Sequence, residues 1–328
     1  MSGVNQMQSV RIGAGGIKRT VNDLGGIIML VVIVGIFSAI NANFINAQNI
    51  ENILFDITPL LIMSIGVTYV LLIGSIDLSV GGITSLACVM TGLWMPRLGY
   101  GIVPVVLLFG LLAGLLNGLI LVRFRIPSFI ITLCTMSVWN CLALVLSNGR
   151  SKAMPPELTK RLAFASLSFG PIPLVFLIGM AIMGMLYFIQ ARTAFGKSVF
   201  AVGANERVAR MSGLQVDAVK VKAFILSGMC SASCGFFLSV KMFSSLPRIG
   251  DPMPLLAIAS AVLGGTSLLG GKGSVIKTLP GVLIVLAIQS GFSVVQLDPY
   301  WQRIAFGTLV LFAVFINTDR IGKTVVIK

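Results

Sequence analysis

The sequence predicts an all-α polytopic membrane protein that crosses the bilayer about ten times. Of its 328 residues, 56% are hydrophobic and only 10% are charged, and its mean hydropathy is +1.00. Soluble domains carry about 25% charged residues, so a large soluble core does not explain this composition. The apolar residues form separate runs, most of them close to the roughly 17–25 residues that a helix needs to cross about 30 Å of hydrocarbon.

The apolar runs divide the chain into one membrane domain at 24–317 and two polar tails at 1–23 and 318–328. The expected spans are 24–42, 53–73, 79–95, 101–122, 127–147, 171–190, 223–242, 253–270, 275–297 and 300–317. The first run has no clear small-residue cleavage site, so we interpret it as a retained helix rather than a signal peptide. The runs at 79–95 and 253–270 are short and contain glycine, which predicts broken or re-entrant segments.

Most Lys and Arg residues lie in the polar segments between the runs, and the net charge is +14. More of the 24 basic residues fall on the side of the N-terminus, and the excess of positive charge in cytoplasmic segments then places both termini in the cytoplasm. Loop 191–222 faces inward in this topology and loop 148–170 faces outward, although four basic residues in loop 148–170 argue for the opposite orientation. Such charges interact with anionic lipid, so a nucleic-acid partner is not expected.

The chain contains five cysteines, none in a C-x-x-C pair, and no histidine. All five cysteines lie inside apolar runs, where this residue usually serves as a small packing residue. The absence of histidine excludes histidine-based catalysis and argues against a structural zinc site. We therefore expect no catalytic residue, no metal and no cofactor in this chain.

Three glycines in the run at 101–122 recur at four-residue spacing. They are Gly110, Gly114 and Gly118, which fall on one face of a helix. A face of small residues lets a second helix approach closely, so the pattern predicts a helix–helix contact.

Residues 74–82 (Gly-Ser-Ile-Asp-Leu-Ser-Val-Gly-Gly) interrupt a long apolar stretch with glycines, two hydroxyls and a carboxylate. An ionised Asp at the bilayer centre costs about 2.5–3.5 kcal/mol, so Asp77 needs a partner or a use. One interpretation is a polar turn between two helices at the membrane surface. The other is irregular backbone that is buried in protein or lines a cavity, which is the form that such backbone takes at membrane depth.

A second glycine cluster at 264–273 lies in the other half of the chain. Corresponding breaks in two halves indicate a possible internal repeat and point to a transport site. The cluster does not form a phosphate-binding loop, because Thr266 stands where the first glycine of that motif belongs and Gly273 follows Lys272. We therefore expect no ATP site in this chain.

The loop at 191–222 is predicted to contain a short capped helix. Asn205 can cap a helix that runs from Glu206 to Ser212, and Gly213 suits the left-handed position that follows a last turn. The predicted helix carries Arg207 and Arg210. Isolated helices this short are marginal, which favours docking on a partner, and the alternative is a solvated basic loop held by lipid headgroups.

A few polar and aromatic residues lie inside or near the apolar runs and can line a path for a polar, uncharged solute. The candidates are Asp77, Ser79, Asn117, Phe129, Trp139, Asn140 and Gln289, and Asp56 and Arg303 are further polar positions. Several, above all Asn117 and Ser79, can instead hydrogen-bond neighbouring helices. No nucleophile, base and orienting group can be assembled from them, which argues against an intramembrane enzyme.

Four sequence blocks resemble the membrane subunits of bacterial sugar ABC importers of the ribose type. They are 74–81 (the family's G-x-I-D-L-S-V-G motif), 117–133 with Ile-Pro-Ser-Phe-Ile-Ile-Thr-Leu, 196–213 with Ala-Val-Gly-Ala-Asn, and 257–274 with Leu-Gly-Gly-Thr-Ser-Leu-Leu-Gly-Gly-Lys-Gly-Ser. The blocks occur in the family's order and cover nearly the whole chain.

The resemblance implies a bacterial inner-membrane permease of about ten spans that pairs with a second copy or a similar permease. It also implies a cytoplasmic ABC ATPase, which would hold ATP and Mg, and a periplasmic sugar-binding protein. The family's ATPase-coupling element maps onto Gly203, Asn205, Glu206, Arg207, Arg210, Ser212 and Gly213. In the predicted topology Asp77 lies toward the cytoplasmic side, so we expect it to act as a gate or structural anchor rather than as a direct sugar ligand.

The chain departs from the family pattern at three places, which leaves the solute open. Asn140-Cys141 replaces Arg-Gly, Pro254-Leu255-Leu256 replaces acidic-Leu-Asp, and Ser290-Gly291 replaces Asn-Gly. A pentose or hexose is the leading expectation. Nucleosides, a signalling sugar derivative and branched-chain amino acids are alternatives within the same class, and a stand-alone secondary transporter or channel and a non-transporting scaffold are alternatives outside it.

Overall fold

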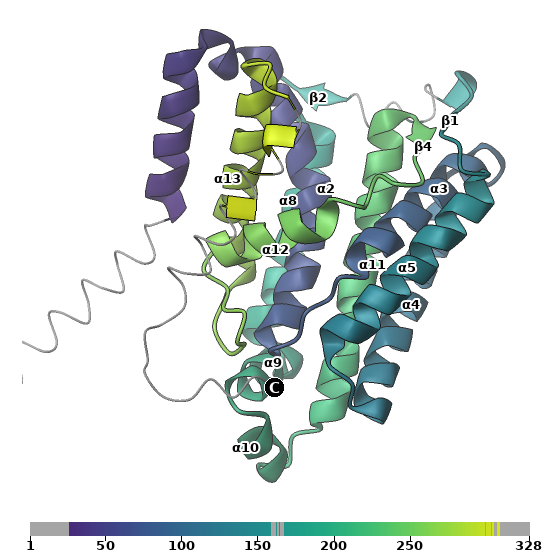
Figure 1. Ribbon diagram of the computed structural model, residues 1–328, viewed down its shortest axis with the longest axis vertical. Coiled ribbons are helices and arrows are strands. Elements are labelled where there is room, and N and C mark those ends of the chain that lie inside the picture. The colour runs from purple at the N-terminus through teal and green to yellow at the C-terminus, as the bar shows by residue number, and fades with distance from the viewer. Residues whose placement is uncertain are drawn as a thin grey trace, which may run out of the picture.

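The computed structural model shows a bundle of helices with very short strands at one end (Figure 1). It describes residues 26–158, 162, 164, 167–298, 300–302, 304 and 307–308. The expected tails at 1–23 and 318–328, most of the expected span at 300–317 and Arg303 lie outside these residues. Within them, the strands form two antiparallel pairs of two residues each, β1 with β4 and β2 with β3.

Helices follow the predicted spans closely, and one of them, Met253–Leu263, is shorter than a span. The elements are Gly26–Ile40, η1 (Ala42–Ile45), α2 (Ala47–Leu72), α3 (Val80–Leu98), η2 (Gly99–Gly101), α4 (Ile102–Phe124), α5 (Ser128–Ser147), β1 (Lys152–Ala153), β2 (Ser168–Phe169), β3 (Ile172–Pro173), α8 (Leu174–Arg192), α9 (Ala194–Ala204), α10 (Glu206–Met211), α11 (Val216–Met242), β4 (Ser244–Ser245), α12 (Met253–Leu263) and α13 (Val275–Val294). Six helical stretches of the described chain are long and apolar enough to cross a membrane, and one of them, Val80–Phe124, contains both α3 and α4.

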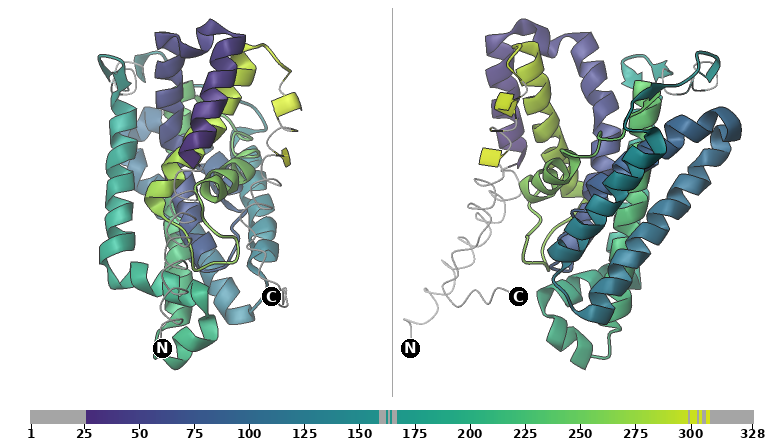
Figure 2. Two further views of the ribbon diagram at one scale, coloured as in Figure 1. Left: turned by 90° about the vertical axis from the view of Figure 1, so that its left-hand side faces the viewer. Right: turned by 45° about the vertical axis from the view of Figure 1, so that its right-hand side comes forward.

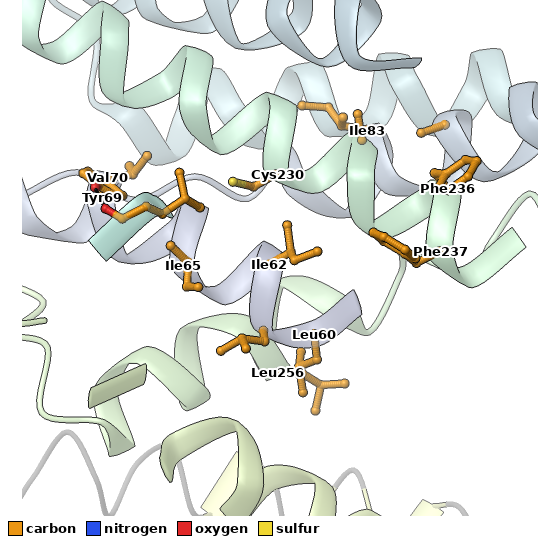
Figure 3. Packing of buried hydrophobic residues seen from close by; sticks show 14 of the residues in the cluster. Leu60, Ile62, Ile65, Tyr69, Val70, Ile83, Cys230, Phe236, Phe237 and Leu256 are labelled. Carbon is orange, nitrogen blue, oxygen red and sulfur yellow. Dashed lines mark hydrogen bonds between the residues drawn. The ribbon is translucent and has the colours of Figure 1, made fainter. Parts of the chain in front are cut away.

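Helices α2 and α11 form the centre of the bundle. In each, 78% of the most apolar window is buried, against 17% in α5, whose surface is therefore free for lipid or a partner chain. Apolar side chains of both central helices meet in the core, among them Ile65 and Cys230 (Figure 3). Tyr69 is fully buried there and donates to the carbonyl of Leu186 on α8 at 2.6 Å.

The predicted glycine face is confirmed. A β-carbon at Gly110 would overlap the backbone of Gly228 on α11, and β-carbons at Gly114 and Gly118 would overlap the backbone near Phe224 and Val221. Glycine therefore lets α4 and α11 pack with their backbones in contact, as small-residue faces do in membrane helices.

Helices α2 and α11 run in opposite directions. Helix α11 starts beside α10, at the end of the bundle that we call the inner end (Figures 1 and 2). It finishes beside the strands, at the opposite end, which we call the strand end. Helix α2 runs from the strand end to the inner end. Each is followed by a break, residues 73–79 after α2 and residues 243–252 after α11, and then by a helix that starts inside the bundle.

Two sequence expectations need correction. Helix α3 continues for 19 residues, so the run at 79–95 is neither broken nor re-entrant, and the break precedes it. The connection at 243–252, which the expected spans at 223–242 and 253–270 leave between them, instead enters the bundle, because Ser245 packs on Gly92 and Gly250 packs on Gly81. This segment therefore descends about 16 Å along α3, at 1.5 Å per helical residue. The prediction of a broken span at 253–270 is confirmed, since α12 has only 11 residues.

Candidate functional site: the break after α2 and its connection to α9 and α10

The break at 73–79 is held by side chains of α5. Gly74 adopts φ +73°, which suits glycine where the chain leaves α2. The N–H of Ile76 donates to Ser128 Oγ at 3.0 Å, and the N–H of Leu78 donates to Thr132 Oγ1 at 3.1 Å. Ser128 and Thr132 lie one turn apart on α5 and so match alternate residues of the extended chain. They satisfy backbone donors that a buried break would otherwise leave unpaired.

Asp77 lies at the centre of this break and is 1% exposed. Its Oδ1 accepts from the N–H and hydroxyl of Ser79 at 3.0 and 2.6 Å, and its Oδ2 accepts from Ser227 Oγ of α11 at 2.8 Å. Asp77 has no ion-pair partner within the described part of the chain. Three donors on a carboxylate stabilise its charged form.

A further hydrogen bond extends this network to α4. Asn117 Nδ2 donates to Ser79 Oγ at 2.7 Å, and both side chains are fully buried. The interpretation of 74–82 as a surface turn is therefore wrong, because its polar groups bond to three helices inside the bundle. Ser79 and Asn117 serve here as hydrogen-bond partners of neighbouring helices, the alternative that the sequence left open for them.

The second break meets the first beside the start of α3. Gly250 donates its N–H to Ser85 Oγ at 3.0 Å, and its backbone touches that of Gly81. Asn140 of α5 reaches the same segment and donates to Asp251 at 3.3 Å. Two helices, α3 and α12, thus begin close together within the bundle, an arrangement typical of transporters with discontinuous helices.

At the inner end, three chain segments meet at their glycines. We call these segments the glycine junction, and they are Leu72–Gly74, Gly203–Ala204 and Gly270–Gly271. The N–H of Gly271 donates to the carbonyl of Leu72 at 2.8 Å. A β-carbon at Gly203 would overlap that same carbonyl, and one at Gly270 would approach the N–H of Gly74. The end of α9 therefore touches the first break and the second glycine cluster directly.

The capped helix predicted in loop 191–222 is confirmed as α10. Asn205 Oδ1 accepts from the N–H of Val208 at 3.1 Å, and Gly213 adopts φ +81°. Arg210 binds Asp217 at the start of α11 through two hydrogen bonds of 2.6 and 3.3 Å, which raise the pKa of its guanidinium.

A second ion pair joins α10 to α11, where Lys220 bonds Glu206 at 2.7 Å. Arg207 is exposed and has no partner among the described residues, and Ser212 bonds back to Val208 within its own turn. The two ion pairs fix the orientation of α10 on α11 and leave Arg207 available.

The remaining predicted path residues do not gather at one point. Phe129 is half exposed on α5, and Trp139 packs edge-on against Phe109 with ring centroids 5.5 Å apart. Gln289 of α13 lies elsewhere, in a pocket of about 120 Å³ that also contains Asp56. The structure therefore divides the predicted path into the buried network of the break, a partly exposed face of α5 and this pocket.

Sequence reasoning missed Ser227 as a partner of Asp77, and it gave Ser128 and Thr132 no role. The hydroxyls of Ser227 and Ser231 lie one turn apart on α11, and a polar pair at that spacing within an apolar run is the signal that was available. It does not reveal which distant residue they approach.

These features define a multi-pass membrane protein built around broken helices. A family model described as "Branched-chain amino acid transport system / permease component" matches residues 49–314, more than half of the chain. The chain therefore belongs to this permease family.

Curated relatives cover almost the whole chain. It is 35% identical to the ribose import permease protein RbsC of Haemophilus influenzae, over 88% of this chain and 91% of that one. It is 32% identical to RbsC of Bacillus subtilis, over 96% and 98% of the two chains. It is 31% identical to the autoinducer 2 import system permease protein LsrC of Photorhabdus luminescens, over 91% and 90%. No solved structure matches the chain.

Proposed function

We propose that this chain is the permease subunit of a bacterial ABC importer and moves a sugar across the inner membrane by alternating access. The observation that carries the proposal is the similarity to two ribose import permeases over 88% and 96% of this chain. The chain itself is not an enzyme in this proposal. A separate ATPase binds ATP and Mg and supplies the energy, and a periplasmic binding protein delivers the sugar at the strand end.

The ATPase docks on α9 and α10, so the inner end faces the cytoplasm. The even number of predicted spans then assigns both chain termini to the cytoplasm as well. Three features of α10 support this assignment. Val208 and Met211 are 58% and 80% exposed, apolar and adjacent to the unpaired Arg207. Apolar anchors beside an Arg are typical of the energetic centre of a protein interface. The ion pairs that Arg210 and Glu206 form with α11 hold α10 in place when the bound ATPase moves.

The glycine junction carries the motion of the ATPases into the membrane. When ATP draws them together, α9 and α10 move, and the end of α9 displaces the residues around Leu72 and Gly271 that it touches. The first break, held by Asp77 and α5, then shifts as a unit and opens the path outward. Asp77 acts as the structural anchor of this unit rather than as a sugar ligand.

A second copy of the permease, or a similar chain, completes the transport unit. The low burial of α5 supports this part of the proposal, because its exposed side chains include the polar Ser137 as well as apolar residues such as Leu133 and Val138. Polar residues on a membrane helix usually face protein or a water-filled path rather than lipid.

Reconstitution tests the function. Proteoliposomes that contain the permease, its ATPase and the binding protein should accumulate labelled ribose only with ATP, and an ATPase variant unable to hydrolyse ATP is the matched control. The permease alone should transport nothing under a proton or sodium gradient. Gradient-driven flux through the permease alone would overturn the proposal in favour of a secondary transporter.

Autoinducer 2 is a second candidate solute, and the similarity to LsrC is the observation that favours it. Competition separates the two in the same proteoliposomes. Excess autoinducer 2 should leave ribose uptake unchanged if the importer is a ribose system, and should suppress it if the signalling molecule is the preferred solute.

A further inference from the structure

We infer that the pocket between α2, α11, α12 and α13 binds one molecule of an uncharged, polyhydroxylated solute of monosaccharide size on its way through the permease. This inference rests on the proposed importer function and names the solute class and the residues that receive it. The pocket has a volume of about 120 Å³ and is lined by Asp56, Pro59, Leu60, Leu256, Leu286 and Gln289, among others.

The position of the pocket suits a solute that enters from the strand end. Asp56 lies about 14 Å from the start of α2, and Gln289 about 8 Å from the end of α13, at 1.5 Å per residue. Both helix ends lie at the strand end (Figure 2). Met253, the first residue of α12, also lines the pocket, so the second break leads directly to it.

The size of the pocket limits the solute. Drug-sized ligands occupy about 300–1,000 Å³, more than this pocket offers. One water molecule needs at least about 10–15 Å³ of the same kind of space, so several water molecules or one small solute fit here. A large nucleoside or a peptide would not.

The polar groups of the pocket offer hydrogen bonds without a net charge. Asp56 forms an ion pair with Lys241 through one carboxylate oxygen, and Lys241 also lies over the ring of Phe55 at 5.7 Å. Among the described residues, the second oxygen of Asp56 is free. The amide of Gln289 has no partner within the same part of the chain, so it presents a donor and an acceptor to the pocket.

This arrangement suits hydroxyl groups. The charges of Asp56 and Lys241 compensate each other, so a solute that carries one net charge finds no net opposite charge in the pocket. Hydroxyls can accept from Gln289 and donate to the free oxygen of Asp56. Leu60 and Leu256, which lie next to one another in Figure 3, form an apolar wall for the C–H face of a sugar ring. Leucine has no hydroxyl group to offer Gln289 and Asp56, so a comparison of ribose with leucine tests the solute class.

Protection of a cysteine tests the assignment. The Gln289→Cys variant is prepared with the exposed Cys134 and Cys141 replaced by Ser, assembled with its ATPase and binding protein, and treated with a small methanethiosulfonate reagent. D-Ribose at about ten times the half-saturating concentration measured for this variant should slow the modification about tenfold, by simple occupancy of the site. L-Leucine at the same concentration should not. Ser293→Cys is the control, because it is exposed on the same helix outside the pocket.

Transport by the same preparations separates failure of the pocket from failure of the function. Gln289→Leu should raise the half-saturating ribose concentration about tenfold, the usual loss for a hydrogen bond in a desolvated site, with ATPase assembly unchanged. If the wild type and the Gln289→Cys variant both import ribose while ribose fails to protect the thiol introduced at position 289, the pocket assignment is wrong and the importer stands. Protection by leucine overturns the solute class. If the wild type imports no ribose, the proposed function fails and the assignment with it.

Discussion

Gly81 of α3 and Gly250 of the second break lie back to back, and a β-carbon on either residue would overlap the carbonyl oxygen of the other. The contact joins the two halves of the chain at the point where each leaves its break. Only glycine allows such an approach of two backbones. The two breaks are therefore one structural unit rather than independent turns.

Gly250→Ala should destabilise this unit. Overpacking of a tight contact costs about 1–3 kcal/mol, and the backbone cannot move away without disturbing the bond from Gly250 to Ser85. We expect a lower thermal midpoint in detergent and reduced uptake. Gly184→Ala on α8 is the control, because the space around Gly184 is open. A Gly250→Ala protein as stable and active as Gly184→Ala would show that the contact is dispensable.

Asp77→Asn should impair assembly or transport far more than Asp298→Asn. The amide of the new Asn would place an N–H next to groups that now donate hydrogen bonds to Asp77, so at least one of these bonds is lost. Hydrogen bonds to a buried charged group are worth about 1.5–3 kcal/mol each. Asp298 is exposed, and its carboxylate accepts only from the N–H of Tyr300 among the described residues. The amount of inserted permease, its thermal midpoint and ribose uptake measure the difference. Equal, mild effects of the two changes would remove Asp77 from its anchoring role.

Sequence reasoning succeeded where the signal is local. The cap of Asn205, the left-handed Gly213 and the glycine face of α4 each depend on residues within a few positions of one another. The partnership of Asp77 with Ser227 depends on folding that brings distant helices together. The inward course of 243–252 was missed because glycine, proline and aspartate in a connecting segment are equally typical of an exposed loop.

Gly213→Val should uncouple the permease from its ATPase. Gly213 sits at φ +81°, where a β-branched residue is strained, so the end of α10 must rearrange. We expect loss of ATPase co-purification and of ATP-driven uptake, with membrane insertion retained. Gly213→Asn is the matched control, because asparagine tolerates left-handed backbone. If the Val variant retains both activities, the end of α10 has no part in coupling.

Gly203→Ala should leave the docking of the ATPase intact but block the transfer of its motion to the membrane helices. The new β-carbon would collide with the carbonyl of Leu72 in the glycine junction, whereas the docking surface of α10 stays unchanged. The variant is therefore expected to retain its ATPase and to lose most uptake. Ser198→Ala controls for a change in the same helix, because Ser198 is half-buried and its hydroxyl bonds to Ala194 within α9. Normal uptake by Gly203→Ala would mean that motion reaches the membrane by another route.

Arg207 and Arg210, which the sequence presents as one basic helix, should respond differently to reversal of charge. Arg210 is occupied by Asp217, so Arg210→Glu breaks an internal ion pair and loosens α10. Arg207 is free to meet an acidic group of the ATPase, and Arg207→Glu is expected to weaken association about tenfold through a contact at the interface itself.

The dependence of ATPase binding on salt distinguishes the two variants, because screening weakens exposed charge pairs. Raising the ionic strength should reduce ATPase binding by the wild type and narrow its advantage over Arg207→Glu. The double variant Arg210→Glu with Asp217→Arg should recover binding by restoring the pair in reverse. If Arg207→Glu binds as tightly as the wild type at low salt, the unpaired arginine is no part of the interface.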